Sequence, residues 1–200
     1  VGSGPDAIAV GGAGLWVANS GGNTIQRIDI ATGAVGAPVD VGDGPDGLAV
    51  DDTSVWVANG RAGSVMRVDV RSGQQMSPPI RVGSGPRGIA RVGDDVWVAD
   101  ELSQSVTRIS VATGHTHSID VGEGPTAVAV LGGSIWVAEK YSGDLVRIDI
   151  GTEQQHTIRV RAAVHGLAVA DGRLWVASGA FASTSHRGGV LRVAAGIVPG

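Results

Sequence analysis

Short apolar stretches recur along the whole chain and are separated by Gly-rich turns. In the first repeat of this pattern they fall at residues 7–10, 15–18, 24–30 and 37–41. Gly-Gly, Asn-Ser-Gly-Gly and Ala-Thr-Gly lie between them, and these residues are typical of tight turns. The pattern therefore predicts four short strands that pair as an antiparallel meander.

The same pattern returns about every 40 residues. All five Trp residues lie in a Trp-Val-Ala run, with spacings of 40, 41, 39 and 39 residues: Trp16, Trp56, Trp97, Trp136 and Trp175. A period of this length with four strands per repeat is typical of a β-propeller, in which each repeat forms one twisted blade. We predict an all-β propeller of five consecutive four-stranded antiparallel blades.

The repeats divide the chain at about 1–40, 41–81, 82–120, 121–160 and 161–200, within a single β-propeller domain over 1–200. The fifth repeat is incomplete. It lacks the Gly-Pro that opens the other four, carries extra residues at 181–187, and runs out before a fourth strand. Its third strand, expected at 190–193, would leave an unpaired edge.

That edge leaves three arrangements open. The tail near Ile197 folds back over it, a neighbouring molecule covers it, or the chain is part of a larger ring. We favour the larger ring, because Val1-Gly2-Ser3-Gly4 matches the end of an outer strand as seen at residues 41–44. We then expect an open edge, or self-association through an open blade face.

The pattern predicts a structural role, and not a ligand-binding one, for the Trp residues and for the Arg residues of the third strands. A large aromatic at the centre of each second strand is expected to pack between blades. In the third strand, Arg67 and Asp69, like Arg147 and Asp149, lie on one face of the strand because side chains alternate. We expect these residues to form ion pairs within the blades.

The repeats resemble the YVTN-type β-propeller repeat. Trp-Val-Ala-Asn at 16–19 and 56–59 stands where that family has its namesake tetrapeptide, and an Arg-Ile-Asp-Ile strand and a Thr-Gly turn follow. Gly-Pro-Asp-Gly-Leu-Ala-Val at 44–50 is also similar to the blades of streptogramin lyases. That second resemblance implies a His, an acidic residue and a metal ion around one mouth of the channel.

The segment His-Arg-Gly-Gly-Val-Leu-Arg-Val at 186–193 is similar to the junction with an extracellular solute-binding domain in actinobacterial multidomain proteins. This resemblance alone favours a bacterial, extracytoplasmic location.

Composition removes several classes of function. The net charge of −4 offers no basic stripe for nucleic acid. The absence of Cys rules out disulfides and thiolate metal sites, and no apolar run is long enough to insert in a membrane.

We expect no cofactor and no metal ion. The Gly-x-Gly-x-x-Gly matches at 42–47 and 83–88 lead into short strands instead of helices, so they do not suit a dinucleotide. His115 and His117 share one strand face, but no third ligand is evident.

The residues that vary between repeats are the candidates for a binding site. Two sets should rim one mouth of the channel, because the loops that carry them open at the same end of a propeller. The first set follows the Gly-Pro or its equivalent: Asp6, Asp46, Arg87, Thr126 and His165. The second follows Trp-Val-Ala: Asn19, Asn59, Asp100, Glu139 and Ser178. A repeating scaffold with varied, polar loop ends favours a ligand-binding rim there.

Two classes of function remain. The preferred one is a non-catalytic binding or sensory module of a larger protein, with a small polar ligand or a partner's loop at the channel mouth. The alternative is a lyase-type propeller enzyme in which His165 and Glu139 act in general acid/base catalysis.

Overall fold

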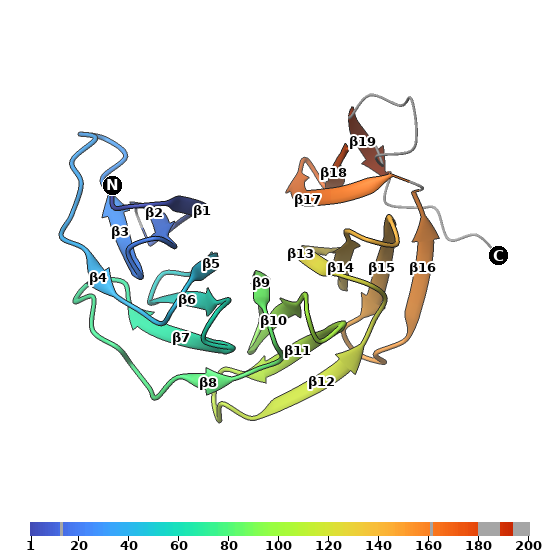
Figure 1. Ribbon diagram of the computed structural model, residues 1–200, viewed down its shortest axis with the longest axis horizontal. Coiled ribbons are helices and arrows are strands. Elements are labelled where there is room, and N and C mark those ends of the chain that lie inside the picture. Colours follow the sequence, from blue (N-terminus) through green and yellow to red (C-terminus); the bar gives the residue numbers. More distant parts are fainter. Residues whose placement is uncertain (13, 161, 180–188, 194–200) are drawn as a thin grey trace.

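The computed structural model describes residues 1–12, 14–160, 162–179 and 189–193. These residues form an all-β, five-bladed β-propeller, as predicted, and its blades follow one another along an arc (Figure 1). The described part of the chain contains no helix that is long and apolar enough to cross a membrane.

Each of the first four blades is a four-stranded antiparallel sheet whose strands pair in chain order. Blade 1 contains β1 (Pro5–Gly11), β2 (Gly14–Asn19), β3 (Thr24–Ile28) and β4 (Val39–Asp40). Blade 2 contains β5 (Pro45–Val50), β6 (Ser54–Asn59), β7 (Ser64–Asp69) and β8 (Ile80–Arg81). Blade 3 contains β9 (Pro86–Val92), β10 (Asp95–Asp100), β11 (Ser105–Ser110) and β12 (Thr116–Asp120). Blade 4 contains β13 (Pro125–Leu131), β14 (Ser134–Glu139), β15 (Asp144–Asp149) and β16 (Gln155–Arg159).

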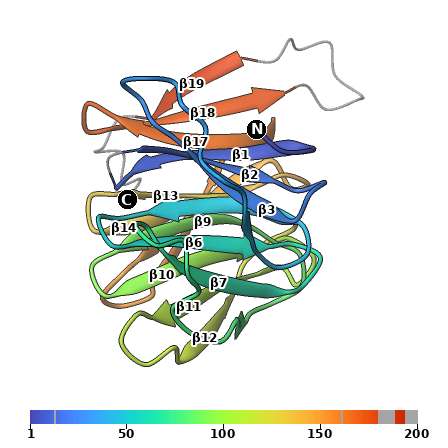
Figure 2. The ribbon, with the colours of Figure 1, turned by 90° about the vertical axis from the view of Figure 1, so that its left-hand side faces the viewer.

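Blade 5 has three strands in the described residues, β17 (Ala163–Ala170), β18 (Arg173–Gly179) and β19 (Gly189–Val193). The incomplete fifth blade is thus confirmed. The extra residues 181–187 and the tail near Ile197 lie outside the described part of the chain. The strands of each blade run side by side when the molecule is seen from the edge of the arc (Figure 2).

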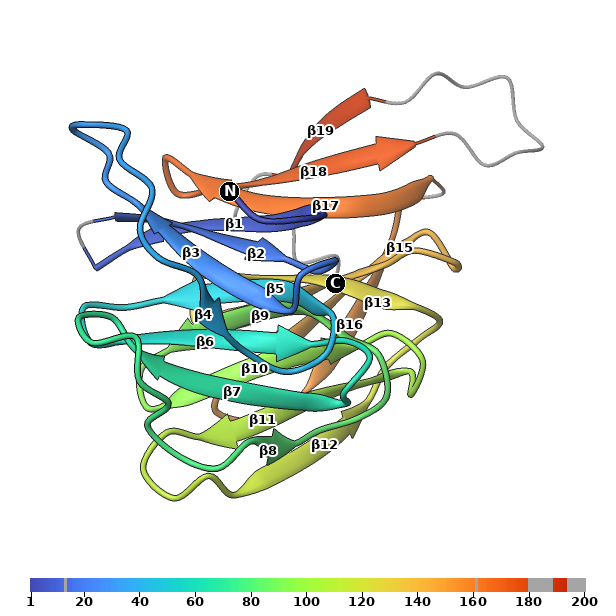
Figure 3. The same ribbon diagram turned by 60° about the vertical axis from the view of Figure 1, so that its left-hand side comes forward.

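Outer strands differ in length, and proline explains the difference. β4 and β8 have two residues each, while β12 and β16 have five. Pro38 directly precedes β4, and Pro78 and Pro79 precede β8; a proline has no N–H to donate to the neighbouring strand. The expected strand at 37–41 is therefore shorter in the structure, and the long loop between β3 and β4 stands away from the blade (Figure 3).

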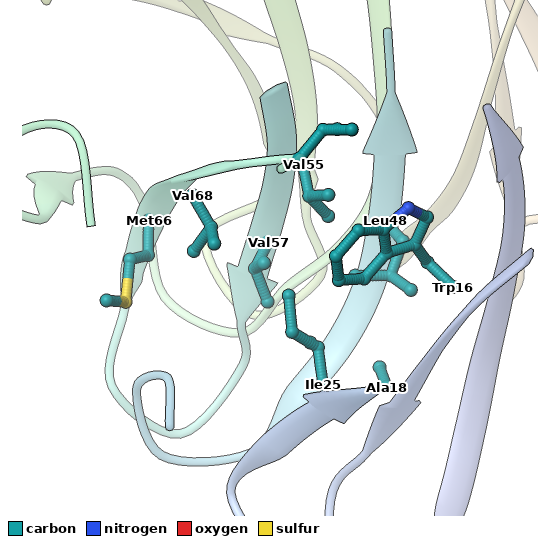
Figure 4. Close-up of a cluster of buried hydrophobic side chains, with 9 residues drawn as sticks. Trp16, Ala18, Ile25, Leu48, Val55, Val57, Met66 and Val68 are labelled. Carbon is teal, nitrogen blue, oxygen red and sulfur yellow. The ribbon is translucent and has the colours of Figure 1, made fainter. Parts of the chain in front are cut away.

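Neighbouring blades pack face to face through two different surfaces. One face of each blade carries the Trp and is here called the Trp face; the opposite face carries Leu, Ile and Val and is called the aliphatic face. Figure 4 shows Trp16, Ala18 and Ile25 on the Trp face of blade 1 pointing toward Leu48 and Val57 on the aliphatic face of blade 2. The same pairing recurs between each later pair of blades. The role of the Trp side chains in blade packing is confirmed.

The expected ion pairs of Arg67 with Asp69 and of Arg147 with Asp149 are not formed, whereas Arg108 in the third strand of blade 3 pairs with Asp95 at 2.7 Å. The Arg67 and Arg147 guanidinium groups donate 2.9 Å hydrogen bonds to the hydroxyls of Ser54 and Ser134 instead. Asp69 accepts hydrogen bonds from the backbone N–H and the hydroxyl of Ser72. These Asp residues therefore hold the turn after the third strand, because a short carboxylate reaches the N–H groups of its own turn more easily than the Arg side chain two residues earlier.

The arc is open between blades 5 and 1. Each pair of successive first strands, from β1 with β5 to β13 with β17, packs closely, whereas β17 and β1 lack such extensive contact. Figure 1 shows β1 and β17 at the two ends of the arc. Blades 1 and 5 therefore do not pack together as successive blades do, and the unpaired edge expected at 190–193 stays a prediction.

Candidate functional site

A β-bulge at the start of each first strand presents the residues predicted for the first rim set. In blade 1, Pro5 pairs with Asn19 and Ala7 with Ala18, so Asp6 is the extra residue outside the ladder. The register shifts at the same place in the other four blades, at the positions of Asp46, Arg87, Thr126 and His165. A bulge re-aims its extra side chain. The innermost strands, which face the centre of the arc in Figure 1, thus each carry one varied residue at a bulge near the start of the strand.

Ion pairs join three of the blades at this mouth. The Arg87 guanidinium lies 3.2 Å from the Glu101 carboxylate and 3.8 Å from the Asp46 carboxylate. The Lys140 ammonium lies 3.7 Å from Glu101, and the Tyr141 hydroxyl donates a 2.9 Å hydrogen bond to Glu101. Glu101 of blade 3 is therefore shared by two cations and one hydroxyl. We call these five residues the mouth network.

Two carboxyl groups meet at the blade 1 end of the mouth network. Burial raises the pKa of Asp46, and a side-chain hydrogen bond with Asp6 raises it further, while the positive charge of Arg87 lowers it. Two neighbouring carboxylates repel each other, so one of them gains affinity for a proton. This end of the mouth therefore carries excess negative charge, next to the positive charge of Arg87.

The second predicted set lies inside the blades instead of on the rim. Asn19, Asn59 and Asp100 are fully buried and Glu139 is 2% exposed. Each side chain packs against a glycine of the loop before the first strand: Gly2, Gly42, Gly83 and Gly122. These four side chains therefore do not line the mouth as the sequence predicted. The chain closes this loop over the end of the second strand because glycine leaves room for the side chain beneath it.

Hydrogen bonds within blades 1, 3 and 4 engage Asn19, Asp100 and Glu139, whereas both amide atoms of Asn59 are buried without a hydrogen-bond partner. The Asn19 amide donates to Thr24 at 3.2 Å and to Gln26 at 3.3 Å. Asp100 accepts a 2.5 Å hydrogen bond from Thr107. Ser178, the fifth member, donates to the Gly189 carbonyl. These polar side chains therefore hold the strands of one blade together.

Glu139 and His165 do not form the predicted pair. The Glu139 carboxylate accepts a 2.6 Å hydrogen bond from the Gly122 N–H and a 2.7 Å bond from the Ser142 hydroxyl, both within blade 4. His165 is exposed, and its imidazole lies over Gly179 of its own blade. No hydrogen bond or ion pair joins these two described residues. Thr126, between them along the chain, has its hydroxyl oxygen buried without a hydrogen-bond partner.

The residues that complete the mouth, Glu101, Lys140 and Tyr141, were missed by the sequence prediction. Glu101 and Lys140 lie one position beyond the predicted Asp100 and Glu139, and Tyr141 two beyond Glu139. Strand alternation carries the usable signal, because neighbouring residues face opposite ways and only one of each pair can leave the blade interior.

A second polar cluster lies on the outer side of blades 3 and 4. The His117 imidazole is 3.2 Å from Glu153, which also lies 3.1 Å from Arg108. Together with Asp95, Ser110 and His115 these residues line a cavity of about 340 Å³. Among the described residues no three His, Asp or Glu side chains are arranged to hold a metal ion.

No family model and no curated protein matches the chain. Solved structures do resemble it. Hydrazine synthase from Kuenenia stuttgartiensis is 23% identical with a TM-score of 0.79, over 90% of this chain and 57% of that one. Virginiamycin B lyase from Staphylococcus aureus is 20% identical with a TM-score of 0.77, over 88% and 63%. The WD40 repeats of RRP9 are 13% identical with a TM-score of 0.77, over 88% and 58%.

The chain thus spans less than two thirds of each of these proteins. At such low identity the likeness establishes the β-propeller fold alone. The resemblances to YVTN-type repeats and to streptogramin lyase blades, read from the sequence, stay predictions.

Proposed function

We propose that this propeller is a non-catalytic binding module whose channel mouth takes a polar ligand or a loop of a partner protein that carries both positive and negative charge. The mouth network is the observation that supports this function. It draws charged side chains from blades 2, 3 and 4 to one place, at positions where the repeats differ from one another.

The exposure of the network suits exchange with a ligand. The Arg87 side chain is 40% exposed and Lys140 33%, whereas Glu101 is 11% exposed. Partly exposed ion pairs are worth only about 0–1 kcal/mol, so a ligand carboxylate can replace Asp46 beside Arg87 at little cost. The Asp6 and Asp46 carboxyls offer a place for a ligand cation at the same mouth. Glu101 keeps both cations in position, and such preorganisation lowers the cost of binding.

Catalysis by His165 and Glu139 has less support. Glu139 is buried with both carboxylate oxygens engaged inside blade 4, so it has no free oxygen to share a proton with His165 at the mouth. The similar structures include proteins named as a synthase, a lyase and a WD40-repeat protein, and this fold therefore does not choose between catalysis and binding.

A peptide selection tests the proposal without knowledge of the natural ligand. A library of displayed random peptides is selected on the unmodified chain alone, and the enriched peptides are then measured on the Arg87→Gln/Lys140→Gln double variant. We expect the enriched peptides to carry acidic and basic residues together. Their affinity, measured by fluorescence anisotropy, should fall at least tenfold in the double variant.

Arg173→Gln is the matched control. Arg173 is exposed at the start of β18, where it pairs with Ala170 at the end of β17 that is far from His165. Its loss should therefore leave the affinity unchanged. Peptides that bind all three proteins equally, or enrichment of apolar peptides alone, would contradict a binding site at the mouth.

A further inference from the structure

The two end blades expose faces that are buried in the blades between them. Val190 of β19 is 68% exposed, whereas its equivalents in the other four blades are all fully buried: Ile25, Val65, Val106 and Leu145. On β1, Ile8 is 65% exposed, while the equivalent Leu48 and Ile89 are 9% and 8% exposed. Each open face is therefore an apolar surface that the same fold covers elsewhere.

These open faces are of opposite kinds. Blade 5 exposes its Trp face, with Ala177 exposed and Trp175 partly exposed. Blade 1 exposes its aliphatic face, where Val10 is 69% exposed beside Ile8. Every interface inside the chain joins a Trp face to an aliphatic face. The two open faces are thus the two halves of one more interface of this type, held apart at the ends of the arc (Figure 1).

We propose that a second copy of this chain covers them, with the Trp face of blade 5 in one copy packed on the aliphatic face of blade 1 in the other. The support is continuity with the four interfaces that the chain already makes. A second copy supplies the missing half with the side chains that fit it. An exposed apolar face on a folded protein marks a contact surface. Such a contact is heterologous, so it leaves one face of each kind free and either closes a ring or extends.

Sedimentation velocity on the chain alone and on two single-face variants tests this pairing. Ile8→Asp blocks the aliphatic face and Ala177→Arg blocks the Trp face. The unmodified chain should associate with increasing concentration, whereas each variant alone should be a monomer, since neither offers both halves. An equimolar mixture of the two variants should form a 1:1 dimer, because one intact pair of faces remains.

Leu102→Asp is the control, since Leu102 is 72% exposed in the loop between β10 and β11 of blade 3, outside both end blades. This variant should associate like the unmodified chain. If Ile8→Asp or Ala177→Arg fails to show the circular dichroism of the folded chain, Val10→Asp or Val190→Asp replaces it on the same face.

Two results would overturn the proposal. A chain that stays monomeric at every concentration assigns the open faces to another occupant, such as further blades of a larger ring. Association by the Ile8→Asp or Ala177→Arg variant alone means that the copies do not pair through opposite faces.

Discussion

The Asp100 carboxylate accepts a 2.5 Å hydrogen bond from the Thr107 hydroxyl in the interior of blade 3. Burial raises the pKa of Asp100 from 3.8 to about 6, although its hydrogen bonds act in the opposite direction. The folded state therefore binds this proton more tightly than the unfolded state. The resulting stabilisation is complete below pH 3.8 and is lost as the pH rises through about 6.

Asp100→Asn should remove this pH dependence. A shift of this size corresponds to a loss on the order of 3 kcal/mol of unfolding free energy between the two pKa values. Asn already occupies the equivalent buried position in blades 1 and 2, at Asn19 and Asn59. We expect the variant to be more stable than the unmodified chain at pH 7 and equal to it near pH 4. Urea unfolding across this range measures the difference.

The exposed Asp52→Asn substitution provides the control and should leave the pH profile unchanged. An Asp100→Asn profile parallel to that of the unmodified chain would show that Asp100 does not titrate in this range.

Gly47→Ala should destabilise the fold. A Cβ at Gly47 would overlap the Arg87 carbonyl oxygen, because the first strands of blades 2 and 3 approach each other closely there. Overpacking of this kind costs about 1–3 kcal/mol, and it would also displace Arg87 from the mouth network. Chemical unfolding gives the change in stability.

Gly166→Ala is the matched control for that substitution. Gly166 holds the same position in blade 5, where the Trp face is open, and the atom nearest to an added Cβ is the Ala177 Cβ at 3.9 Å. We expect a change within about 0.5 kcal/mol or a small gain, since Ala restricts the unfolded chain. Equal losses of unfolding free energy in Gly47→Ala and Gly166→Ala would contradict the close approach of blades 2 and 3 at Gly47 and the open space beside Gly166.

Gln104→Gly should stabilise the chain. Gln104 has a φ of 56°, in the left-handed region, and the equivalent residues in blades 2 and 4 are Gly63 and Gly143. Relief of this conformation stabilises the folded chain, whereas the greater conformational entropy of glycine stabilises the unfolded chain. The first effect is larger, and the net gain is about 0.5–1 kcal/mol. Thermal unfolding should show a higher Tm. Gln74→Gly, at an exposed loop position without a positive φ, should show no gain.

The sequence allowed the five blades to be predicted because the repeat is local and regular. The spacing of the Trp residues and the turn residues between strands are enough to define each blade. Outer-strand length was less predictable. Pro38 and the Pro78-Pro79 pair carry the signal, but their effect depends on which strand edge faces the neighbouring strand.

The candidate site was only half predictable. Asp6, Asp46 and Arg87 of the first rim set do lie together, whereas a ligand-binding role for the set stays a prediction. The bulge that re-aims Asp46 and Arg87 is set by pairing with the second strand and leaves no mark in the sequence pattern. The burial of Asp100 and Glu139 depends on the loop that closes over them. Because of that long-range contact, Asp100 and Glu139 are buried, and the residues that follow them, Glu101 and Lys140, reach the mouth.

Tyr141 provides a direct test of the mouth network, since it is the only Tyr in the chain. Its hydrogen bond to Glu101 and the negative charge of that carboxylate raise its pKa above 10.0, while the positive charge of Arg87 lowers it. The ultraviolet absorbance of tyrosinate reports this ionisation, and circular dichroism shows whether the chain remains folded.

The decisive measurement is therefore the Tyr141 titration in the unmodified chain, in Glu101→Gln and in Arg87→Gln. The pKa of Tyr141 should fall toward 10.0 in Glu101→Gln and rise above that of the unmodified chain in Arg87→Gln, because one substitution removes a negative charge and the other a positive charge. The same pKa in all three folded proteins would contradict a mouth network that joins blades 3 and 4 and with it the basis of the proposed binding function.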